Sequence, residues 1–161
     1  MVKLSRLFCL SVDALITDVK SYIELDNVAK AINFKMKYIY NKHKRGEDIE
    51  ESLCNLMRIF LPNIKRNEVF DAAVYGTLKA TLYAMLEDKN INENTYNVNT
   101  LKDVLQFANL DRNDKRANIL AYFKDKSKRC KELISVYVNN ADTTAMNIIC
   151  MLEARINIAI E

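Results

Sequence analysis

The clearest hydrophobic pattern in the chain lies in residues 67–88, NEVFDAAVYGTLKATLYAMLED. Its apolar or small residues recur every three or four positions: Val69, Phe70, Ala73, Val74, Thr77, Leu78, Thr81, Leu82, Met85 and Leu86. This spacing places them along one stripe of an α-helix. Further alanines and tyrosines extend the apolar surface round the helix, so it needs neighbours on several sides. We therefore predict a central apolar helix at about 67–88, in which Gly76 permits the close approach of another helix.

The pattern also predicts elements on both sides of this segment. In chain order they are a helix at about 3–24, a second from a cap at Asp26 to Gly46, a third from a capping-box start at Asp48 to Pro62, a polar loop at 89–99, a short helix capped by Thr100, and a last helix capped by Asp142. Short polar side chains cap helix starts by accepting hydrogen bonds from free backbone N–H groups, whereas Gly and Pro end helices.

Residues 114–138 allow two interpretations. Their apolar or small positions are spaced 3, 4, 3, 4 and 3 apart, which favours one helix: Leu120, Phe123, Ser127, Cys130, Ile134 and Tyr137. The polar DKSKR sequence in the middle instead favours a break into two helices. The pattern by itself leaves both alternatives open.

Composition supports the all-α interpretation. Half of the 161 residues are hydrophobic, and only two Gly and one Pro are present, so the turns that β-rich folds require are scarce. We predict a single domain, 1–161, that forms an all-α bundle of six to eight helices around the central helix. The abundance of Asn, Lys, Ile and Tyr is typical of AT-rich genomes, including those of large DNA viruses. Amphipathic helices around one apolar helix resemble the Bcl-2-like bundle, but its Asn-Trp-Gly-Arg groove motif is absent, and no family is assigned.

Cysteine and histidine usage argues against a metal centre. Cys9, Cys54, Cys130 and Cys150 are far apart, and His43 is the only histidine, so zinc-ligand spacing is missing. Each cysteine lies in an apolar helical pattern, where a free thiol behaves as a small hydrophobe. No signal peptide or uninterrupted membrane span is recognised. We expect free thiols, no cofactor, no metal, and an intracellular, cytoplasmic location, which would be the host cytoplasm if the source is viral.

No catalytic set is recognised either. His43 is flanked by lysines at a helix end, which favours an exposed side chain over a general base. Glu50 with Glu51, and Asp111 with Asp114, lie at predicted helix starts, where acidic groups stabilise the helix dipole. We therefore predict a protein that is not an enzyme.

Two basic stripes are candidate sites for an anionic ligand. The first comprises Lys35, Tyr38, Lys42 and Arg45, and the second comprises Lys124, Lys128 and Lys131. Basic groups interleaved with an aromatic ring can contact phosphates and stack on a base. Ordinary solvated helix faces explain the same pattern.

The last predicted helix has more apolar residues than one buried face can hold. Ile148, Ile149, Leu152 and Ile156 are assigned to the core, which leaves a candidate partner interface of Met146, Cys150, Ile158 and Ile160. The leading hypothesis is a non-enzymatic module that binds a protein, either as a partner helix in a groove or as a homodimer. The alternative is a small helical RNA-binding or nucleocapsid-associated protein that uses the basic stripes.

Overall fold

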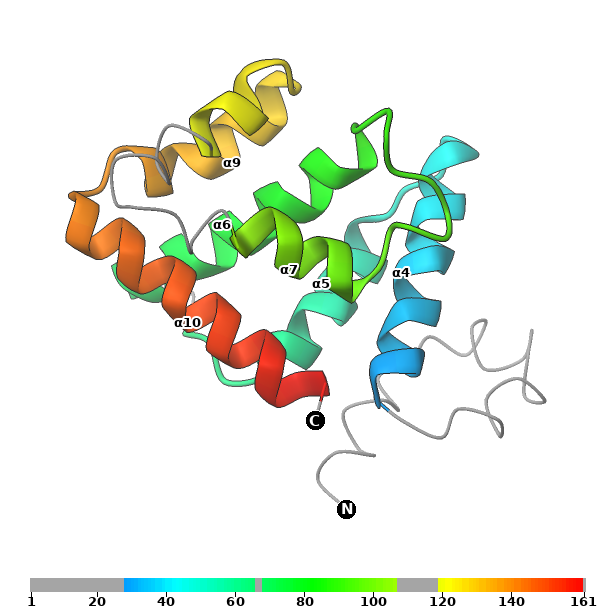
Figure 1. Ribbon diagram of the computed structural model, residues 1–161, viewed down its shortest axis with the longest axis horizontal. Coiled ribbons are helices and arrows are strands. Elements are labelled where there is room, and N and C mark those ends of the chain that lie inside the picture. Colours follow the sequence, from blue (N-terminus) through cyan, green and yellow to red (C-terminus); the bar gives the residue numbers. More distant parts are fainter. Residues whose placement is uncertain (1–27, 66–67, 107–118, 161) are drawn as a thin grey trace.

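The structure is a computed structural model that describes residues 28–65, 68–106 and 119–160 (Figure 1). These residues form an all-α helical bundle without strands, which confirms the predicted fold class. The labelled helices are α4 (Val28–Lys44), α5 (Glu50–Phe60), α6 (Val69–Leu86), α7 (Val98–Gln106), α9 (Lys128–Val138) and α10 (Asp142–Ile160). Residues 119–124 are also helical. The predicted helix 3–24, the cap at Asp26 and the pair Asp111 and Asp114 lie outside the described residues.

Helix ends agree with the sequence more closely than helix starts do. Gly46 has a φ of +73° just after α4, and Pro62 follows α5 closely, as predicted. The start of α5 differs, because the residue before it is Ile49 and Asp48 accepts a hydrogen bond from the Glu50 N–H at 3.0 Å. The helix therefore begins one residue later than a capping box at Asp48 requires, and that prediction is wrong.

The short helix α7 begins three residues earlier than expected, at Val98. The side-chain oxygen of Asn97, immediately before the helix, accepts the backbone N–H of Thr100 at 3.0 Å. An Asn at a helix start satisfies one of the free N–H groups. The prediction that Thr100 caps this helix is therefore wrong, since Thr100 lies inside its first turn.

The ambiguous segment is broken into two helices over the residues that are described. Helix 119–124 ends before a short turn, and α9 begins at Lys128. Ser127 Oγ accepts the Cys130 N–H at 3.3 Å and so caps α9. The 3, 4 spacing therefore does not mark one continuous helix, and of its six residues Leu120 and Ser127 are exposed.

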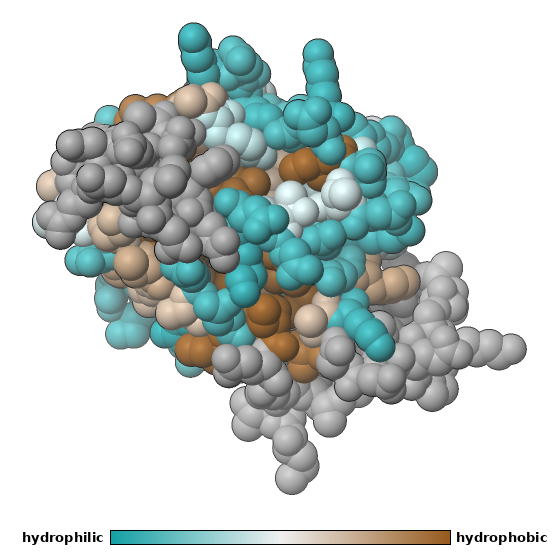
Figure 2. Space-filling view, viewed as in Figure 1, coloured by the Kyte–Doolittle hydropathy of each residue, from teal (hydrophilic) through white to brown (hydrophobic). Residues whose placement is uncertain are grey.

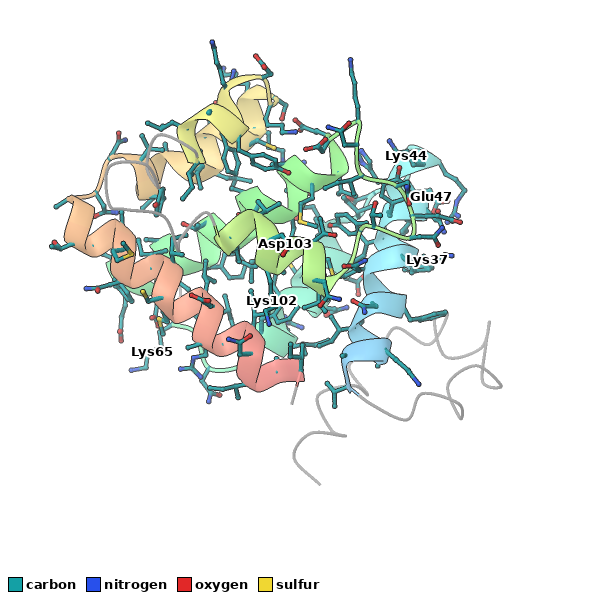
Figure 3. All side chains as sticks on the ribbon, in the orientation of Figure 1. Lys37, Lys44, Glu47, Lys65, Lys102 and Asp103 are labelled. Carbon is teal, nitrogen blue, oxygen red and sulfur yellow. The ribbon has the colours of Figure 1, made fainter. Side chains whose placement is uncertain are left out.

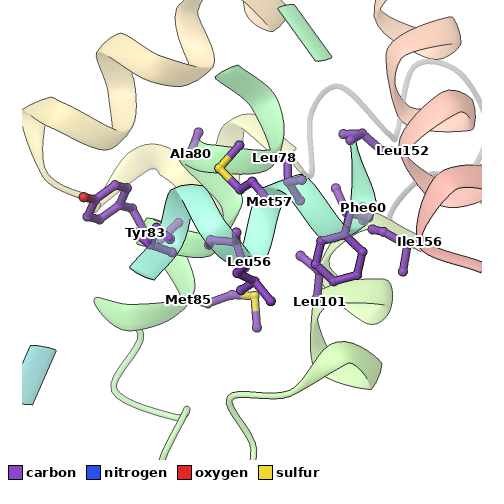
Figure 4. Close-up of a cluster of buried hydrophobic side chains, with 14 of the residues drawn as sticks. Leu56, Met57, Phe60, Leu78, Ala80, Tyr83, Met85, Leu101, Leu152 and Ile156 are labelled. Carbon is purple, nitrogen blue, oxygen red and sulfur yellow. The ribbon is translucent and has the colours of Figure 1, made fainter. Parts of the chain in front are cut away.

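The α6 helix contacts α5, α7, α9 and α10. Gly76 lies where α9 crosses closely, since a Cβ atom at this position would be 3.3 Å from the Leu133 carbonyl oxygen. This confirms that Gly76 permits a close approach. Figure 4 shows Leu78 of α6, Phe60 of α5 and Ile156 of α10 among the buried side chains of the core. Whether α6 dominates the stability of the bundle stays a prediction.

The predicted polar loop before α7 is anchored to the bundle by two tyrosines. Tyr96 is fully buried, and its hydroxyl donates to the Leu82 carbonyl oxygen at 3.2 Å. The Tyr40 hydroxyl donates to the Ile91 carbonyl oxygen, also at 3.2 Å. The Asn-rich sequence concealed this packing, because its few apolar residues follow no helical period.

Candidate functional site

The α10 helix presents one face to the core and one to solvent. Its buried residues are Ala145, Ile148, Ile149, Leu152, Ile156 and Ala159. This confirms the predicted core assignment of the three isoleucines and Leu152. Figure 2 shows apolar residues, tan to brown, along α10 at the lower left of the molecule, with hydrophilic residues between them.

The four residues predicted as a partner interface differ in exposure. Cys150 is exposed, and 56% of the surface of Ile158 is accessible. Met146 and Ile160 are half-buried, and Ile160 packs against the hydrophobic core. The available part of the predicted surface is therefore centred on Cys150 and Ile158.

One segment of α10, Thr143–Ile160, is long and apolar enough to cross a membrane by length and composition alone. The segment contains Glu153 and Arg155, so it is not an uninterrupted apolar stretch, and the expectation that the chain has no membrane span stays a prediction. The signal is weak evidence for a span, because a buried helix of a soluble bundle passes the same test. Ile148, Leu152 and Ile156 are fully buried against other helices here, as in a core helix with one outward face.

A shallow groove runs beside α10, between that helix and the connection from α5 to α6. Its lining residues are Leu61, Asn63, Ile64, Asp71, Met151 and Arg155, and we call it the α10 groove. Figure 3 shows Lys65 of the same connection extending near α10. The sequence analysis missed these residues, because periodicity within one helix does not reveal which loop packs beside it.

The two charged residues of the α10 groove have different surroundings. The Asp71 carboxylate accepts the backbone N–H of Lys65 at 2.8 Å. Arg155, in contrast, has no ion pair or hydrogen bond with the part of the chain that the structure describes. The groove therefore contains an acid that accepts a backbone hydrogen bond and a guanidinium group whose donors are unused by residues 28–65, 68–106 and 119–160.

The first basic stripe is not formed as predicted. Lys35 is only 7% exposed, because α4 packs against α5, α7 and α10 and so buries a wide face. Tyr38 and Lys42 are half-buried, and Arg45 is exposed and hydrogen-bonded to Glu47. Placing Lys35 on an exposed stripe was therefore wrong, and reversing its charge is expected to destabilise the fold instead of only affecting a surface.

The second basic stripe is interrupted by the turn before α9. Lys124 precedes this turn, whereas Lys128 and Lys131 follow it, so the three do not share one continuous helix. All three are exposed, and Lys128 pairs with Glu132 at 3.7 Å. Figure 1 shows α4 and α9 on different sides of the bundle, so the two stripes do not form one basic surface.

A polar network around Glu50 joins three helices. Its carboxylate accepts the Tyr83 hydroxyl at 3.1 Å and pairs with Lys79 at 2.9 Å and with Arg129. The Arg129 guanidinium lies over the Tyr83 ring, 4.3 Å from its centroid. Burial raises the pKa of Tyr83 to about 12, so its hydroxyl keeps the donated proton at neutral pH. Glu50 therefore connects α5 to α6 and α9, and both of its oxygens are engaged.

Two further carboxylates hold the start of α9 against the end of α6. Glu87 accepts the Ser127 N–H at 2.7 Å, and Asp88 pairs with Lys126 at 3.4 Å. Burial by itself raises the pKa of each acid. At Glu87, hydrogen bonds from Ser127 lower the pKa by more than burial raises it. At Asp88, the Asn90 N–H and Lys126 lower the pKa by more than burial raises it, so the pKa of both carboxyls is below its usual value.

These pKa shifts predict a loss of stability in acid. Because the folded pKa of each group is below its unfolded value, both groups stabilise the fold above about pH 5, and the effect is lost as the pH falls through the folded pKa. The double variant Glu87→Gln, Asp88→Asn should be less stable than wild type at neutral pH and should lose less stability by pH 3. Urea midpoints at several pH values measure this. Asp103→Asn, at an exposed position on α7, is the control. The prediction is contradicted if the urea midpoints of wild type and double variant change equally with pH.

Cys54, Cys130 and Cys150 are free thiols in the described part of the chain, whereas Cys9 lies outside it. Burial raises the pKa of Cys130 to about 11, and its Sγ lies 3.3 Å from a Glu87 oxygen. A thiol of this pKa stays protonated at neutral pH, which disfavours nucleophilic chemistry. No group of three potential metal-ligating side chains occurs among residues 28–65, 68–106 and 119–160.

The structure thus brings together an exposed apolar part of α10 and the α10 groove, and it separates the basic stripes. Comparison of the chain with protein-family models, with curated proteins and with solved structures finds no match.

Proposed function

We propose that the protein is a non-enzymatic interaction module that binds another protein, or a second copy of itself, through the outward face of α10 and the α10 groove. The observation that carries the proposal is Ile158, a β-branched apolar side chain that is more than half exposed on the outward face of a helix whose other face is buried in the core. Exposed apolar residues beside a groove are typical of docking surfaces for protein partners.

The RNA-binding alternative has less support. A phosphate-binding surface needs several unpaired cations on one face. Lys35 is buried, Arg45 is hydrogen-bonded to Glu47, and Lys128 is paired with Glu132. Of the other stripe cations, Lys42 is half-buried on α4, whereas Lys124 and Lys131 are exposed on either side of the turn before α9. Protein binding is therefore the better supported of the two hypotheses.

The proposal predicts that Ile158→Asp weakens association without unfolding the protein. A carboxylate in a contact surface has to be desolvated on binding, whereas at an exposed position of the free protein it stays in water. Light scattering after size-exclusion chromatography, up to high micromolar concentration, detects self-association, and capture on immobilised protein detects other partners. Circular dichroism checks that helical content is unchanged.

Val136→Asp is the matched control, because Val136 is an exposed β-branched residue on a different helix, α9. We expect this variant to associate like wild type. The proposal fails if the wild-type protein stays monomeric and every protein that it captures is also captured by the Ile158→Asp variant. In that case α10 serves only the core.

A further inference from the structure

We propose that the partner seated in the α10 groove is an amphipathic α-helix that carries an acidic side chain within its apolar face, and that its carboxylate pairs with Arg155. The inference rests on the proposed function and specifies the chemistry of the partner. Three properties support it: the apolar floor of the groove, the guanidinium group of Arg155 without an ion pair among the described residues, and the spacing of exposed and half-buried residues along α10.

The floor of the groove is apolar and adaptable. Leu61 is 4% exposed and forms part of the core, while Ile64 and Met151 are half-buried and pack against it. A thioether side chain is unbranched and flexible, so Met151 can adjust to the shape of an inserted side chain. An aliphatic anchor such as Leu or Met therefore suits this floor.

Asp71 and Arg155 give the groove no net formal charge, but they differ in the hydrogen bonds that they make within the described part of the chain. Asp71 already accepts the Lys65 N–H, whereas Arg155 makes no ion pair or hydrogen bond with residues that the structure describes. A guanidinium group presents a planar set of donors that matches a carboxylate in two parallel hydrogen bonds. Arg155 is also half-buried beside apolar side chains, where a charge pair is screened less than on an open surface.

The exposed lysines make poorer carboxylate sites. Lys124 and Lys131, for example, are exposed and do not line the α10 groove. Long exposed side chains lose rotamer entropy on pairing, so such pairs contribute little. The combination of an unmatched guanidinium group and an apolar floor therefore points to the α10 groove.

The spacing along α10 favours a helical partner. Met151, Arg155 and Ile158 are separated by four and then three residues, so they form one stripe that extends over about two helical turns, or about 10 Å. A helix laid into a groove contacts it with side chains at positions i, i+3, i+4 and i+7. A peptide that binds by adding a strand would instead need an open strand edge, and residues 28–65, 68–106 and 119–160 contain no strand.

The test is a selection of helical peptides from a displayed library on the full-length wild-type protein. The library holds amphipathic sequences of about 20 residues with the apolar-face positions randomised. We expect enrichment of peptides with Leu, Met or Phe anchors and an Asp or Glu between them. Their affinity should fall at least about tenfold for Arg155→Glu, because a charge pair becomes a like-charge contact. Exchanging the peptide acid for Lys should restore binding to this variant.

Arg58→Glu is the matched control, because Arg58 is an exposed arginine on α5 that is hydrogen-bonded to Asn55. It should bind the selected peptides like wild type, and Arg155→Lys should lose less affinity than Arg155→Glu. Circular dichroism confirms that each variant is folded. Peptides without an acidic residue, or with equal affinity for wild type and Arg155→Glu, would overturn the inference.

The outcomes also separate this inference from the proposed function. If the peptides lose affinity for Ile158→Asp but not for Arg155→Glu, the proposed contact surface on α10 is supported and the inference of an acidic partner is refuted. Peptides that are insensitive to both substitutions would reject both proposals. If Arg155→Glu instead abolishes self-association of the protein, and no peptide is enriched, the occupant is a second copy and the inference of a foreign helix fails.

Discussion

Replacing Leu78 by Ala is expected to lower the free energy of unfolding by roughly 2–5 kcal/mol, the usual cost of truncating a buried leucine. Leu78 is fully buried on α6, which contacts four other helices. The cost has two parts, the lost transfer of apolar atoms out of water and the cavity that rigid neighbours leave behind. Leu82→Ala should have a similar effect, because Leu82 is also fully buried. Urea denaturation followed by circular dichroism measures both.

Leu120→Ala is the control for this prediction. Leu120 is 43% exposed in the helix 119–124, so the same truncation removes less apolar area from the interior and creates no closed cavity. It should cost well under half as much as the α6 substitutions. If Leu78→Ala and Leu82→Ala each cost less than about 1 kcal/mol, α6 does not determine the stability of the bundle.

Replacing Gly76 by Val should destabilise the protein by about 1–3 kcal/mol, the usual cost of overpacking. A Cβ atom at position 76 would already lie 3.3 Å from the Leu133 carbonyl oxygen. Val adds two methyl groups to that atom, and the obstacle is backbone, which cannot rotate aside as a side chain can. We expect α9 to be pushed away from α6, and hydrogen exchange of the α9 amides should be faster than in wild type.

Gly76→Ala separates the steric effect from the helix propensity of glycine. Ala needs a shift of only a few tenths of an ångström at this contact, and Ala is favoured over Gly in a helix interior by up to about 1 kcal/mol. The two effects oppose each other, so Gly76→Ala should be close to neutral. A Val variant as stable as the Ala variant would contradict the close packing of α6 against α9.

The carboxylates between the end of α6 and the start of α9 are engaged in polar contacts within the protein. Glu50, Glu87 and Asp88 are each paired or hydrogen-bonded to residues at the start of α9 or just before it. Acids occupied in this way stabilise the arrangement of helices, and they leave few free polar groups for chemistry in this region. Arg155 is the contrasting case, since its donors are unused by the described part of the chain.

Local signals in the sequence were sufficient for the helices themselves. Positions such as Gly46 and Pro62 act through backbone geometry, and helix periodicity depends only on neighbours three or four residues away. These effects do not depend on the rest of the fold. The all-α class, the extent of α6 and the core face of α10 could therefore be predicted before the structure was known.

The boundaries set by side-chain hydrogen bonds were less predictable. Asp48 and Thr100 are both good capping residues, yet Ile49 precedes α5, and Asn97 supplies the hydrogen bond at the start of α7. Several nearby polar residues compete for each helix start with similar energies. Packing of the connecting loop then decides between them, as the buried Tyr96 shows for the loop before α7.

The candidate site depended on tertiary structure. Lys35 is buried because other helices cover both sides of the α4 stripe, and the pattern of α4 alone does not show how many neighbours it has. The α10 groove likewise combines Met151 and Arg155 with a connection almost a hundred residues earlier in the chain. Sequence alone thus determined which of the described segments are helical and much of what is buried, because these follow from local geometry and hydrophobicity, with exceptions such as Lys35, Val69 and Leu120. Only the tertiary structure decided which polar and apolar side chains meet at the surface, because that depends on the pairing of segments that are distant in sequence.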